Sequence, residues 1–325
     1  MSDRTTSLEG LHDLKRLLDE RGISMSNWVE MSQRGFSGAR IYMQSNREGG
    51  SYVMKVTSAD TDWIMRATSD HRCREAILAN AGFAREIHSP AIGSAQDGAT
   101  FSILMWDVSE HLLSNDPLTR EQLDTLLLGM ARLHARTPPD GLDVPWCSIE
   151  DRLTLFMPDP EKLARFRIGQ DILKGWGLFF EHAPKSVADL VRALFDDIGP
   201  LERALGKLPN SLLHGDLKLD NIGILPDGTL SLIDWSMPMV APAAVELGWF
   251  LAMNSRALPI SLDETMAAYT SSANLDSRLH ARHQALTILC GLLIRGWRKG
   301  LDAGSGEPSE LRWWCERASA ASKML

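Results

Sequence analysis

Apolar residues near the start of the chain are spaced first as in a helix and then as in strands. In residues 7–23, five leucines recur every three or four positions on one helical face, and Gly22 marks the predicted helix end. These leucines are Leu8, Leu11, Leu14, Leu17 and Leu18. From Trp28 to Val56, strand-like stretches are separated by GFSG and NREGG, which predicts three antiparallel strands joined by glycine-containing turns.

Helical spacing returns in residues 69–83, SDHRCREAILANAGF, and a buried strand is predicted in residues 100–108, TFSILMWDV. Beyond Leu112 the pattern is mostly helical. We therefore predict an α+β fold with two lobes. Residues 1–107 would form a small lobe with an antiparallel sheet, and residues 108–325 a larger, mainly helical lobe.

The segment SLLHGDLKLDNIGIL, residues 211–225, interrupts apolar sequence with polar groups. His214, Asp216 and Asn221 lie between two strand-like runs, and Asp227–Gly228 is a strong hairpin signal before a return strand at residues 230–233. The hairpin would bring Asp234 close to the polar cluster.

These motifs carry a family resemblance. HGDLKLDN, with IDW thirteen residues after Asn221, resembles the HxDxxxxN catalytic loop and the metal-binding aspartate of the aminoglycoside phosphotransferase and choline kinase family. This family comprises small-molecule relatives of protein kinases, so the resemblance implies their two-lobed fold. GFSGARIY, VMKV, CREAIL, ILMWDV and MARLHA are similar to further family motifs, in the expected order, across residues 28–255.

The chemistry of phosphoryl transfer explains the same residue types independently. The reaction needs both reactants held in line and the phosphate charge neutralised. Mg²⁺ prefers hard oxygen ligands and keeps several waters, so Asn221 and Asp234 suffice as its protein ligands. Asp216 is the candidate catalytic base for the hydroxyl proton. His214 is expected to orient the loop rather than to transfer protons.

The resemblance also implies a nucleotide site in the small lobe. Lys55 would pair with the α and β phosphates of ATP, or of GTP, and Glu75 would hold its ammonium group. Glu86 is an alternative to Glu75, because sequence register alone does not decide between them. Phosphate contacts are implied for Gly35 and Ser37, and adenine contacts for the hinge. The hinge residues are Met105, Trp106, Asp107 and Val108.

Composition and charge limit the kinds of partner and the cellular location that are expected for this protein. The formal net charge of -8 and the lack of a Lys/Arg-rich block argue against a nucleic-acid partner. The four cysteines lie far apart, which indicates reduced thiols in a cytoplasmic protein rather than zinc ligands or a disulfide framework. The polar start of the chain resembles no signal peptide, and the longest apolar run, residues 285–294, is too short to span a bilayer.

Two departures from the family pattern leave the number of metal ions open. Ser236 stands where many relatives carry an acidic residue, and Glu246 stands where Asp is common, with an expected role in bracing the catalytic region. His134 is expected to brace the catalytic loop as well. The ten tryptophans have two possible roles. Packing in the core is favoured, and a stacking wall for a ring-bearing substrate is the alternative.

The resulting prediction is a small-molecule kinase that phosphorylates a hydroxyl group. Its acceptor stays open among an aminoglycoside, another sugar-like antibiotic, a choline-like amine and a metabolite alcohol, so a role in antibiotic resistance is one expectation. The sequence also leaves the oligomeric state open. A nucleotide-binding pseudokinase and a protein kinase are the rivals. The second is disfavoured, because HRDLKxxN, DFG and APE segments are absent from the sequence.

Overall fold

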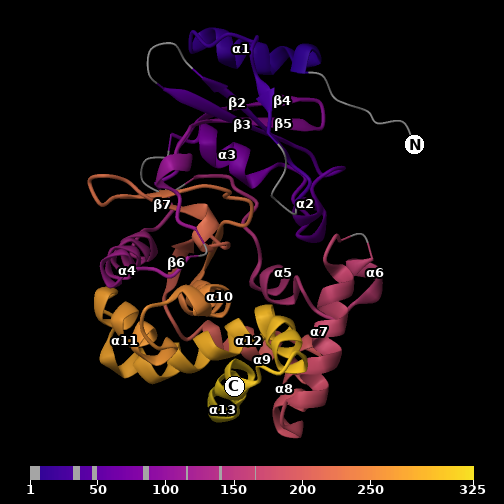
Figure 1. Cartoon of the computed structure of the whole chain (residues 1–325), viewed down its shortest axis with the longest axis vertical. Helices are drawn as coiled ribbons and strands as arrows, with labels where there is room; N and C mark the ends of the chain where they lie inside the picture. The colour runs from indigo at the N-terminus through magenta and orange to yellow at the C-terminus, as the bar shows by residue number, and fades with distance from the viewer. Residues whose placement is uncertain are drawn as a thin grey trace.

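The structure is a computed structural model that describes residues 8–31, 37–45, 50–82, 88–114, 116–138, 141–164 and 166–325. A five-stranded antiparallel sheet with flanking helices is followed by a mainly helical part (Figure 1). This confirms the predicted α+β class. The sheet strands are β1 (Val29–Glu30), β2 (Arg40–Ser45), β3 (Ser51–Thr57), β4 (Ala91–Asp97) and β5 (Thr100–Trp106).

The strands lie in the order β1-β2-β3-β5-β4, and each neighbouring pair is antiparallel. The three strands expected before residue 57 are β1, β2 and β3. The sequence analysis did not predict β4. Its residues AIGSAQD contain few large apolar side chains, and the hairpin signal Asp97–Gly98 that joins it to β5 was overlooked.

The alternation of side chains along β3 separates two cores. Met54 and Val56 face α1 (His12–Glu20) and pack with its leucines, including Leu14 and Leu18. Val53 packs instead with the core next to α3 (Arg74–Asn80). Lys55 shares the parity of Val53, so β3 directs it towards α3.

The helical part is built around one long central helix, α12 (His280–Gly304), which packs on α7 (Gly169–His182), α10 (Ala244–Asn254) and α13 (Ser309–Ala321) (Figure 1). Gly300 allows the approach of α7, because a Cβ there would lie 2.2 Å from the carbonyl oxygen of Gly175. The other α-helices not yet named are α2 (Trp63–Ala67), α4 (Arg120–His134), α5 (Ile149–Thr154), α6 (Pro160–Leu163), α8 (Lys185–Asp196), α9 (Gly199–Leu205) and α11 (Leu262–Ser272). Short 3-10 helices are η1 (Leu8–Gly10), η2 (Ser109–His111), η3 (Leu219–Asn221), η4 (Ser255–Ala257), η5 (Ser277–Leu279) and η6 (Ser322–Met324).

Two small sheets frame the polar segment. The predicted hairpin is present, as β7 (Ile222–Ile224) pairs with β8 (Leu230–Leu232) across a turn in which Gly228 has φ +79°. The first strand-like run, β6 (Asn210–Leu213), pairs instead with β9 (Met239–Pro242), which was not predicted. The polar loop is therefore held between two separate ladders and not at the edge of one hairpin.

The chain leaves the five-stranded sheet after β5, and the proposed division after residue 107 stays a prediction. Within the described ranges, no helix combines the length and apolar character needed to cross a bilayer. The four cysteines are buried free thiols, Cys73, Cys147, Cys290 and Cys315.

Candidate functional site

Segments far apart in the sequence meet at the loop between β6 and β7. This loop carries His214, Asp216 and Asn221, and Asp234 follows β8. The small sheet contributes Lys55 from β3. Lys55 pairs with Asp234, and Asn221 bonds to Asp216. The charges of both Asp216 and Asp234 raise the pKa of Lys218, so the structure brings the polar residues selected from the sequence into one region.

Lys55 lies between two carboxylates. Its Nζ is 2.7 Å from Oε2 of Glu75 and 2.6 Å from Oδ1 of Asp234. Burial lowers the pKa of Lys55, but the charges of Asp234 and Glu75 outweigh burial and raise it well above its ordinary value. Lys55 is therefore a fixed cation. Glu86, the alternative to Glu75, lies outside the described residues.

The two carboxylates differ in their electrostatics. Burial raises the pKa of Asp234, but the charges of Lys55 and Lys218 outweigh it and hold the pKa well below its usual range. Burial is also the main cause that raises the pKa of Glu75, and the nearby charge of Asp234 adds to it. Asp234 is thus the carboxylate that stays ionised most firmly.

Asp216 is buried, and its Oδ2 atom has two partners. Nδ2 of Asn221 donates to Oδ2 at 3.1 Å, and Nζ of Lys218 lies 3.2 Å from the same oxygen. The charge of Asp216 raises the pKa of Lys218. Among the described residues, no partner is found for Oδ1 of Asp216, which leaves that oxygen available to a ligand.

His214 fixes the loop against the segment that follows β8. Its Nδ1 accepts a hydrogen bond from the backbone N–H of Asp216 at 3.2 Å, and its Nε2 lies 2.9 Å from the carbonyl oxygen of Ile233. This network assigns the proton to Nε2 of a neutral ring. The ring also packs on Trp235 with a centroid distance of 4.5 Å. These contacts are consistent with an orienting role.

Glu246 holds the backbone of the same loop from α10. Its Oε1 accepts the N–H of Gly215 at 2.5 Å, and its Oε2 accepts the N–H of His214 at 3.2 Å. Nε2 of His134 lies 2.8 Å from Oε2, and Nδ1 of His134 lies 2.6 Å from the hydroxyl of Tyr269. The bracing contacts expected for Glu246 and His134 are therefore present.

Only glycine fits at position 215. Its φ is +84°, and a Cβ there would lie 1.9 Å from the carbonyl oxygen of Met237. The loop is consequently held close to the segment between β8 and β9.

Asn221 and Asp234 fit the ligand preference of Mg²⁺. The Asn221 amide uses its nitrogen for Asp216, which leaves the hard amide oxygen for a metal. Asp234 has φ +64°, a left-handed conformation that is uncommon for non-glycine residues and that Asp and Asn adopt more readily than most. No group of three or more His, Cys, Asp or Glu ligands occurs in the described part of the chain, so phosphate oxygens and water would complete the shell.

The structure describes some of the residues that were predicted to bind the nucleotide. Gly35 lies outside the described residues. The carbonyl oxygen of Ser37 accepts the backbone N–H of Trp63 at 3.0 Å, which ties the predicted phosphate loop to α2. In the predicted hinge, Met105 is buried in the sheet, and the N–H of Asp107 donates to Ser51.

One hinge feature remains open to a ligand. Among the described residues, no hydrogen-bond partner is found for the backbone N–H of Val108, and a free N–H donor suits the edge of a purine base. The exposed Trp106 ring packs on Tyr52 with a centroid distance of 4.9 Å, on the face of the sheet that α1 covers, so only the backbone of Trp106 can contact a base on the Lys55 side.

Sequence reasoning missed Arg152, whose Nε donates to the carbonyl oxygen of Gly215 at 2.6 Å. It lies 63 residues before Gly215, in a helix without a recognisable motif, so local sequence gave no signal for it.

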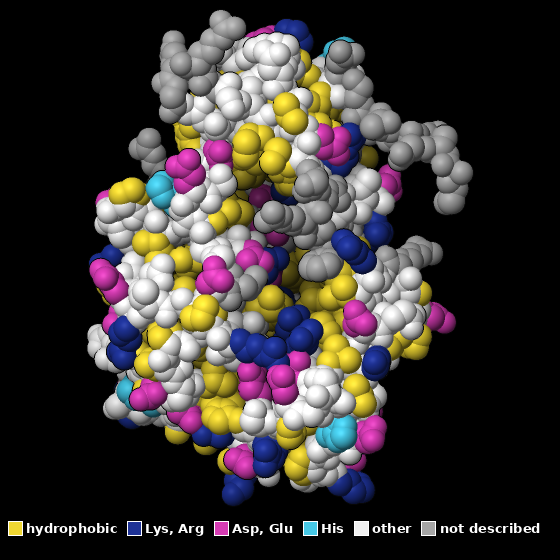
Figure 2. All heavy atoms as spheres, in the orientation of Figure 1, with side chains coloured by type: hydrophobic (Ala, Val, Ile, Leu, Met, Phe, Trp, Pro, Cys, Tyr) yellow, Lys and Arg dark blue, Asp and Glu magenta, His cyan; other side chains and the backbone are white. Residues whose placement is uncertain are grey.

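Figure 2 shows a hollow between the sheet part and the helical part, with Lys and Arg side chains gathered along its lower edge.

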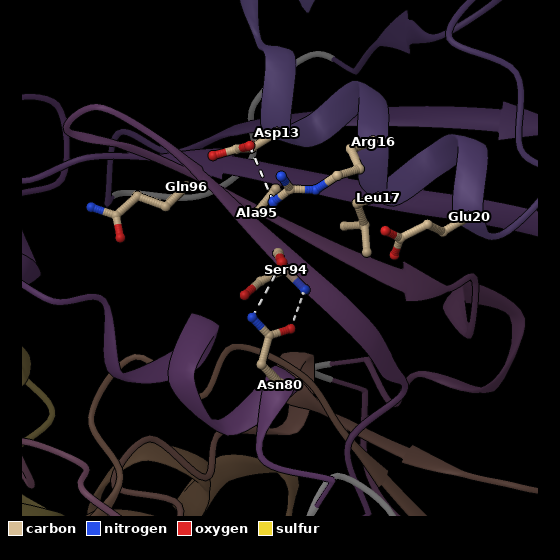
Figure 3. A pocket seen from close by; sticks show the side chains of 8 residues that line it. All are labelled: Asp13, Arg16, Leu17, Glu20, Asn80, Ser94, Ala95 and Gln96. Carbon is tan, nitrogen blue, oxygen red and sulfur yellow. Dashed lines mark hydrogen bonds and ion pairs between the residues drawn. The ribbon is translucent and has the colours of Figure 1, made fainter.

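A separate hollow of about 350 Å³ lies beside α1 and β4 (Figure 3). Within it, Arg16 pairs with Asp13, and Asn80 bonds to the backbone of Ser94. Because α1 covers the face of the sheet opposite to Lys55, this hollow is not continuous with the site described above.

Comparisons with known proteins agree with this picture. The sequence model of the phosphotransferase enzyme family matches residues 33–286, which is most of the chain. No curated protein matches the chain by sequence.

Several solved structures are similar. An ethanolamine kinase from Plasmodium vivax is 14% identical with a TM-score of 0.53, and the match covers 95% of this chain and 86% of that chain. An aminoglycoside phosphotransferase from Streptomyces rimosus is 16% identical with a TM-score of 0.51, covering 84% and 97%. A spectinomycin phosphotransferase, solved with ADP and spectinomycin, is 15% identical with a TM-score of 0.50, covering 96% and 98%. At such identities the likeness concerns the fold, and it confirms the predicted kinase-like architecture.

Proposed function

The chain belongs to the phosphotransferase enzyme family, and from this premise we propose that it transfers the γ-phosphoryl group of ATP to a hydroxyl group of a small molecule. One observation carries the proposal. Lys55 and Asp234 form a 2.6 Å ion pair beside the loop of Asp216, so phosphate-binding and proton-accepting groups share one region.

In the proposed reaction, the acceptor oxygen forms a bond to the γ-phosphorus while the bond from that phosphorus to the bridging oxygen of ADP breaks. The hydroxyl proton passes to Oδ1 of Asp216, and the products are a phosphate ester and ADP. Because Lys218 and Asn221 hold the other oxygen, the carboxylate is fixed for this transfer. Such help by a positioned base is worth roughly 10²–10⁴ in rate.

The other residues would position and neutralise the nucleotide. Lys55 would contact the α and β phosphates, and Glu75 would keep its ammonium group in place. Asn221 and Asp234 would hold Mg²⁺, which neutralises charge on the phosphate oxygens when bound. Met105, Trp106, Asp107 and Val108 would contact the base, with ATP as the expected donor and GTP as an alternative. Such a reaction agrees with the cytoplasmic location expected from the free thiols.

A small acceptor is favoured over a protein acceptor. The loop reads HGDLKLDN where protein kinases carry HRDLKxxN, and Asp234 is followed by Trp235 and Ser236 and not by Phe-Gly. The similar solved structures include an ethanolamine kinase and a spectinomycin phosphotransferase.

The test is a screen of hydroxyl compounds for magnesium-dependent ADP release, with purified wild-type protein and Asp216→Asn. We expect one class of compound to stimulate turnover, and we expect turnover to fall at least 100-fold in Asp216→Asn while nucleotide binding is kept. Asp227→Asn is the matched control, because Asp227 lies in the exposed β7–β8 turn, where Asn is equally suited.

Two outcomes would contradict the proposal. Nucleotide binding without turnover for any acceptor would favour a pseudokinase. Phosphate from γ-labelled ATP on polypeptide, and none in the small-molecule fraction, would favour a protein kinase.

A further inference from the structure

A cluster of buried hydrogen-bond donors lies beside the Asp216 loop. The arginine–tryptophan cluster consists of Trp63, Arg152, Trp249, Arg295 and Trp297. Buried N–H groups of all five side chains lack a hydrogen-bond partner in the described part of the protein: Nη1 and Nη2 of Arg152, Nε of Arg295, and the three indole nitrogens. Buried polar groups are nearly always paired, so this concentration of unpaired donors requires an explanation.

The three tryptophan rings of the cluster surround Phe156, and the two arginines lie against these rings. The centroid of Phe156 lies 6.0 Å from Trp63, 6.3 Å from Trp249 and 6.4 Å from Trp297. The guanidinium carbon of Arg152 lies 4.5 Å from the Trp249 ring centroid, and that of Arg295 lies 5.8 Å from it. Two cations therefore share one indole ring.

The cluster contacts both the loop that carries the proposed base, Asp216, and the predicted phosphate loop. Nε of Arg152 binds the carbonyl oxygen of Gly215, which directly precedes Asp216. The backbone N–H of Trp63 binds the carbonyl oxygen of Ser37, in the predicted phosphate loop. Trp63 and Arg295 are only half-buried, so the cluster is accessible to solvent at these members, whereas Arg152 is fully buried next to the loop.

Among the residues that the structure describes, the arginines of the cluster lack the carboxylate partners that neighbouring arginines have. Arg298, one turn after Arg295 on α12, forms an ion pair with Asp302 at 3.1 Å, and Arg256 pairs with the same carboxylate. In the described part of the chain, no carboxylate lies within ion-pair distance of Arg152 or Arg295. Burial lowers the pKa of Arg295 to about 10, which still leaves it charged at neutral pH.

Other tryptophans account for the packing interpretation. The indole N–H of Trp176 donates to the carbonyl oxygen of Phe156 at 2.6 Å, and that of Trp235 donates to Leu232 at 3.1 Å. These two rings are core residues with satisfied polar atoms. Trp63, Trp249 and Trp297 have no such partner among the described residues. The indole N–H of Trp314 is also unpaired in the described part of the chain, but that ring is buried against Gly291 of α12. The gathering of the first three rings around Phe156, beside two unpaired arginines, favours the alternative of a stacking wall for this set.

We propose that the arginine–tryptophan cluster binds the phosphate acceptor and selects a hydroxyl compound that carries a carboxylate or a similar acceptor-rich anion on a flat apolar frame. This inference rests on the proposed function. All unpaired groups of the cluster are donors, and two of them are cationic, so a ligand must supply acceptor oxygens and negative charge. An aminoglycoside-like polycation would bring ammonium donors and positive charge to two arginines, and is disfavoured.

The test uses the full chain and three probes of matched shape: para-(hydroxymethyl)benzoate, its amide, and para-(hydroxymethyl)benzylamine. Binding is measured by the shift of the melting temperature with ADP and Mg²⁺ present, and ADP release is measured separately. We expect the benzoate to bind at least about tenfold more tightly than the benzylamine. Arg295→Gln should weaken benzoate binding about tenfold or more and should strengthen benzylamine binding, because one of the two repelling cations is removed.

Two further variants sharpen the comparison. Arg298→Gln, on the same helix, should keep wild-type benzoate binding because Arg298 is already neutralised by Asp302. Arg295→Lys keeps the charge without the planar fork and should fall between wild type and Arg295→Gln. Equal binding of benzoate and benzylamine, equal effects of Arg295→Gln and Arg298→Gln, or no shift with any probe would overturn the inference.

The two readouts separate the inference from the proposed function. Arg295-dependent benzoate binding without ADP release from any acceptor in the screen would support the anion subsite and contradict the phosphotransferase reaction. Turnover of cationic acceptors that is insensitive to Arg295→Gln would support the reaction and contradict the subsite.

Discussion

The ammonium nitrogen of Lys55 lies 2.6 Å from Oδ1 of Asp234, although 179 residues separate the two in the sequence. Lys55 comes from the middle of the sheet, and Asp234 follows a hairpin in the helical part. This ion pair links the sheet part to the helical part at the proposed phosphate site, and the residues around it can be tested separately for stability and for catalysis.

Lys55→Met should reduce both the stability of the protein and its catalytic efficiency. Glu75 would become a buried carboxylate without a cation, which costs on the order of 3–5 kcal/mol of unfolding free energy. The efficiency of ATP use should fall by about 100-fold or more, since a phosphate contact is lost. Urea unfolding and steady-state kinetics measure the two effects.

The double variant Lys55→Met, Glu75→Gln is the matched control for Lys55→Met. It removes the unpaired charge, so it should recover part of the unfolding free energy and none of the activity. Recovery of activity together with stability would show that Lys55 has no role beyond the ion pair.

Asp234 allows the charge to be tested apart from the backbone. Its φ of +64° is tolerated by Asn but strained for Ala, so Asp234→Asn should lose only the stability that comes from its charge interactions with Lys55 and Lys218, and Asp234→Ala should lose an additional ~1–2 kcal/mol. Both variants should lose magnesium-dependent turnover by roughly 100-fold, because a metal ligand is removed. A magnesium titration of ADP release measures this.

Chelation provides an independent check. Removing divalent cations with EDTA should abolish turnover of the wild-type protein, and Mg²⁺ should restore it. A magnesium dependence of Asp234→Asn equal to that of wild type would rule out Asp234 as a metal ligand.

Glu246→Gln should lower kcat and leave KM for ATP within about twofold. Gln can offer only one acceptor oxygen to the N–H groups of Gly215 and His214, so the loop that presents Asp216 loses an anchor. The expected loss in kcat is about tenfold to 100-fold. Glu316→Gln, an exposed change on α13, should leave both constants unchanged.

A rise in KM for ATP without a fall in kcat would contradict this positioning role. Burial raises the pKa of Glu246, but the hydrogen bond from His134 and nearby charges outweigh burial and hold the pKa below its ordinary value. Glu246 is therefore ionised at neutral pH and can accept both backbone donors.

Much of the candidate site could be located from sequence because its residues lie in short motifs with fixed spacing. The HGDLKLDN loop lies between two apolar runs, and a hairpin signal places Asp234 nearby. Lys55 and Glu75 are implied by the resemblance of VMKV and CREAIL to family motifs, with Glu86 as an alternative to Glu75. These positions come together in the structure, while their catalytic roles remain predictions.

Other parts of the molecule could not be predicted, because their local sequence does not indicate their structure or their contacts. β4 and β9 lack an apolar alternation, and their pairing is decided by partners elsewhere in the chain. Arg152 and Arg295 lie on helices whose sequences look unremarkable. Their significance depends on side chains from distant elements that fail to pair with them, and hydrophobic periodicity does not report such relationships.

His283 provides a stability prediction that is independent of catalysis. Its ring is buried and stacks on Tyr269 at a centroid distance of 5.8 Å, close to His134 and His280. Burial, and to a smaller extent the charges of these two histidines, lowers its pKa from 6.5 to about 4. The unfolded chain therefore binds one more proton than the folded protein between these values, and the unfolding free energy falls as the pH drops from 6.5 to 4.

The full effect of this histidine is on the order of 3 kcal/mol. His283→Phe removes the titration and keeps the ring on Tyr269, and the adjoining hollow of about 160 Å³ offers room for the larger side chain. Urea unfolding of this variant should show a smaller loss of stability between pH 6.5 and 4 than wild type. His182→Phe, at an exposed position at the end of α7, should follow the wild-type curve. Parallel pH profiles for wild type and His283→Phe would show that His283 is protonated to the same extent in the folded and unfolded states, contrary to the burial argument.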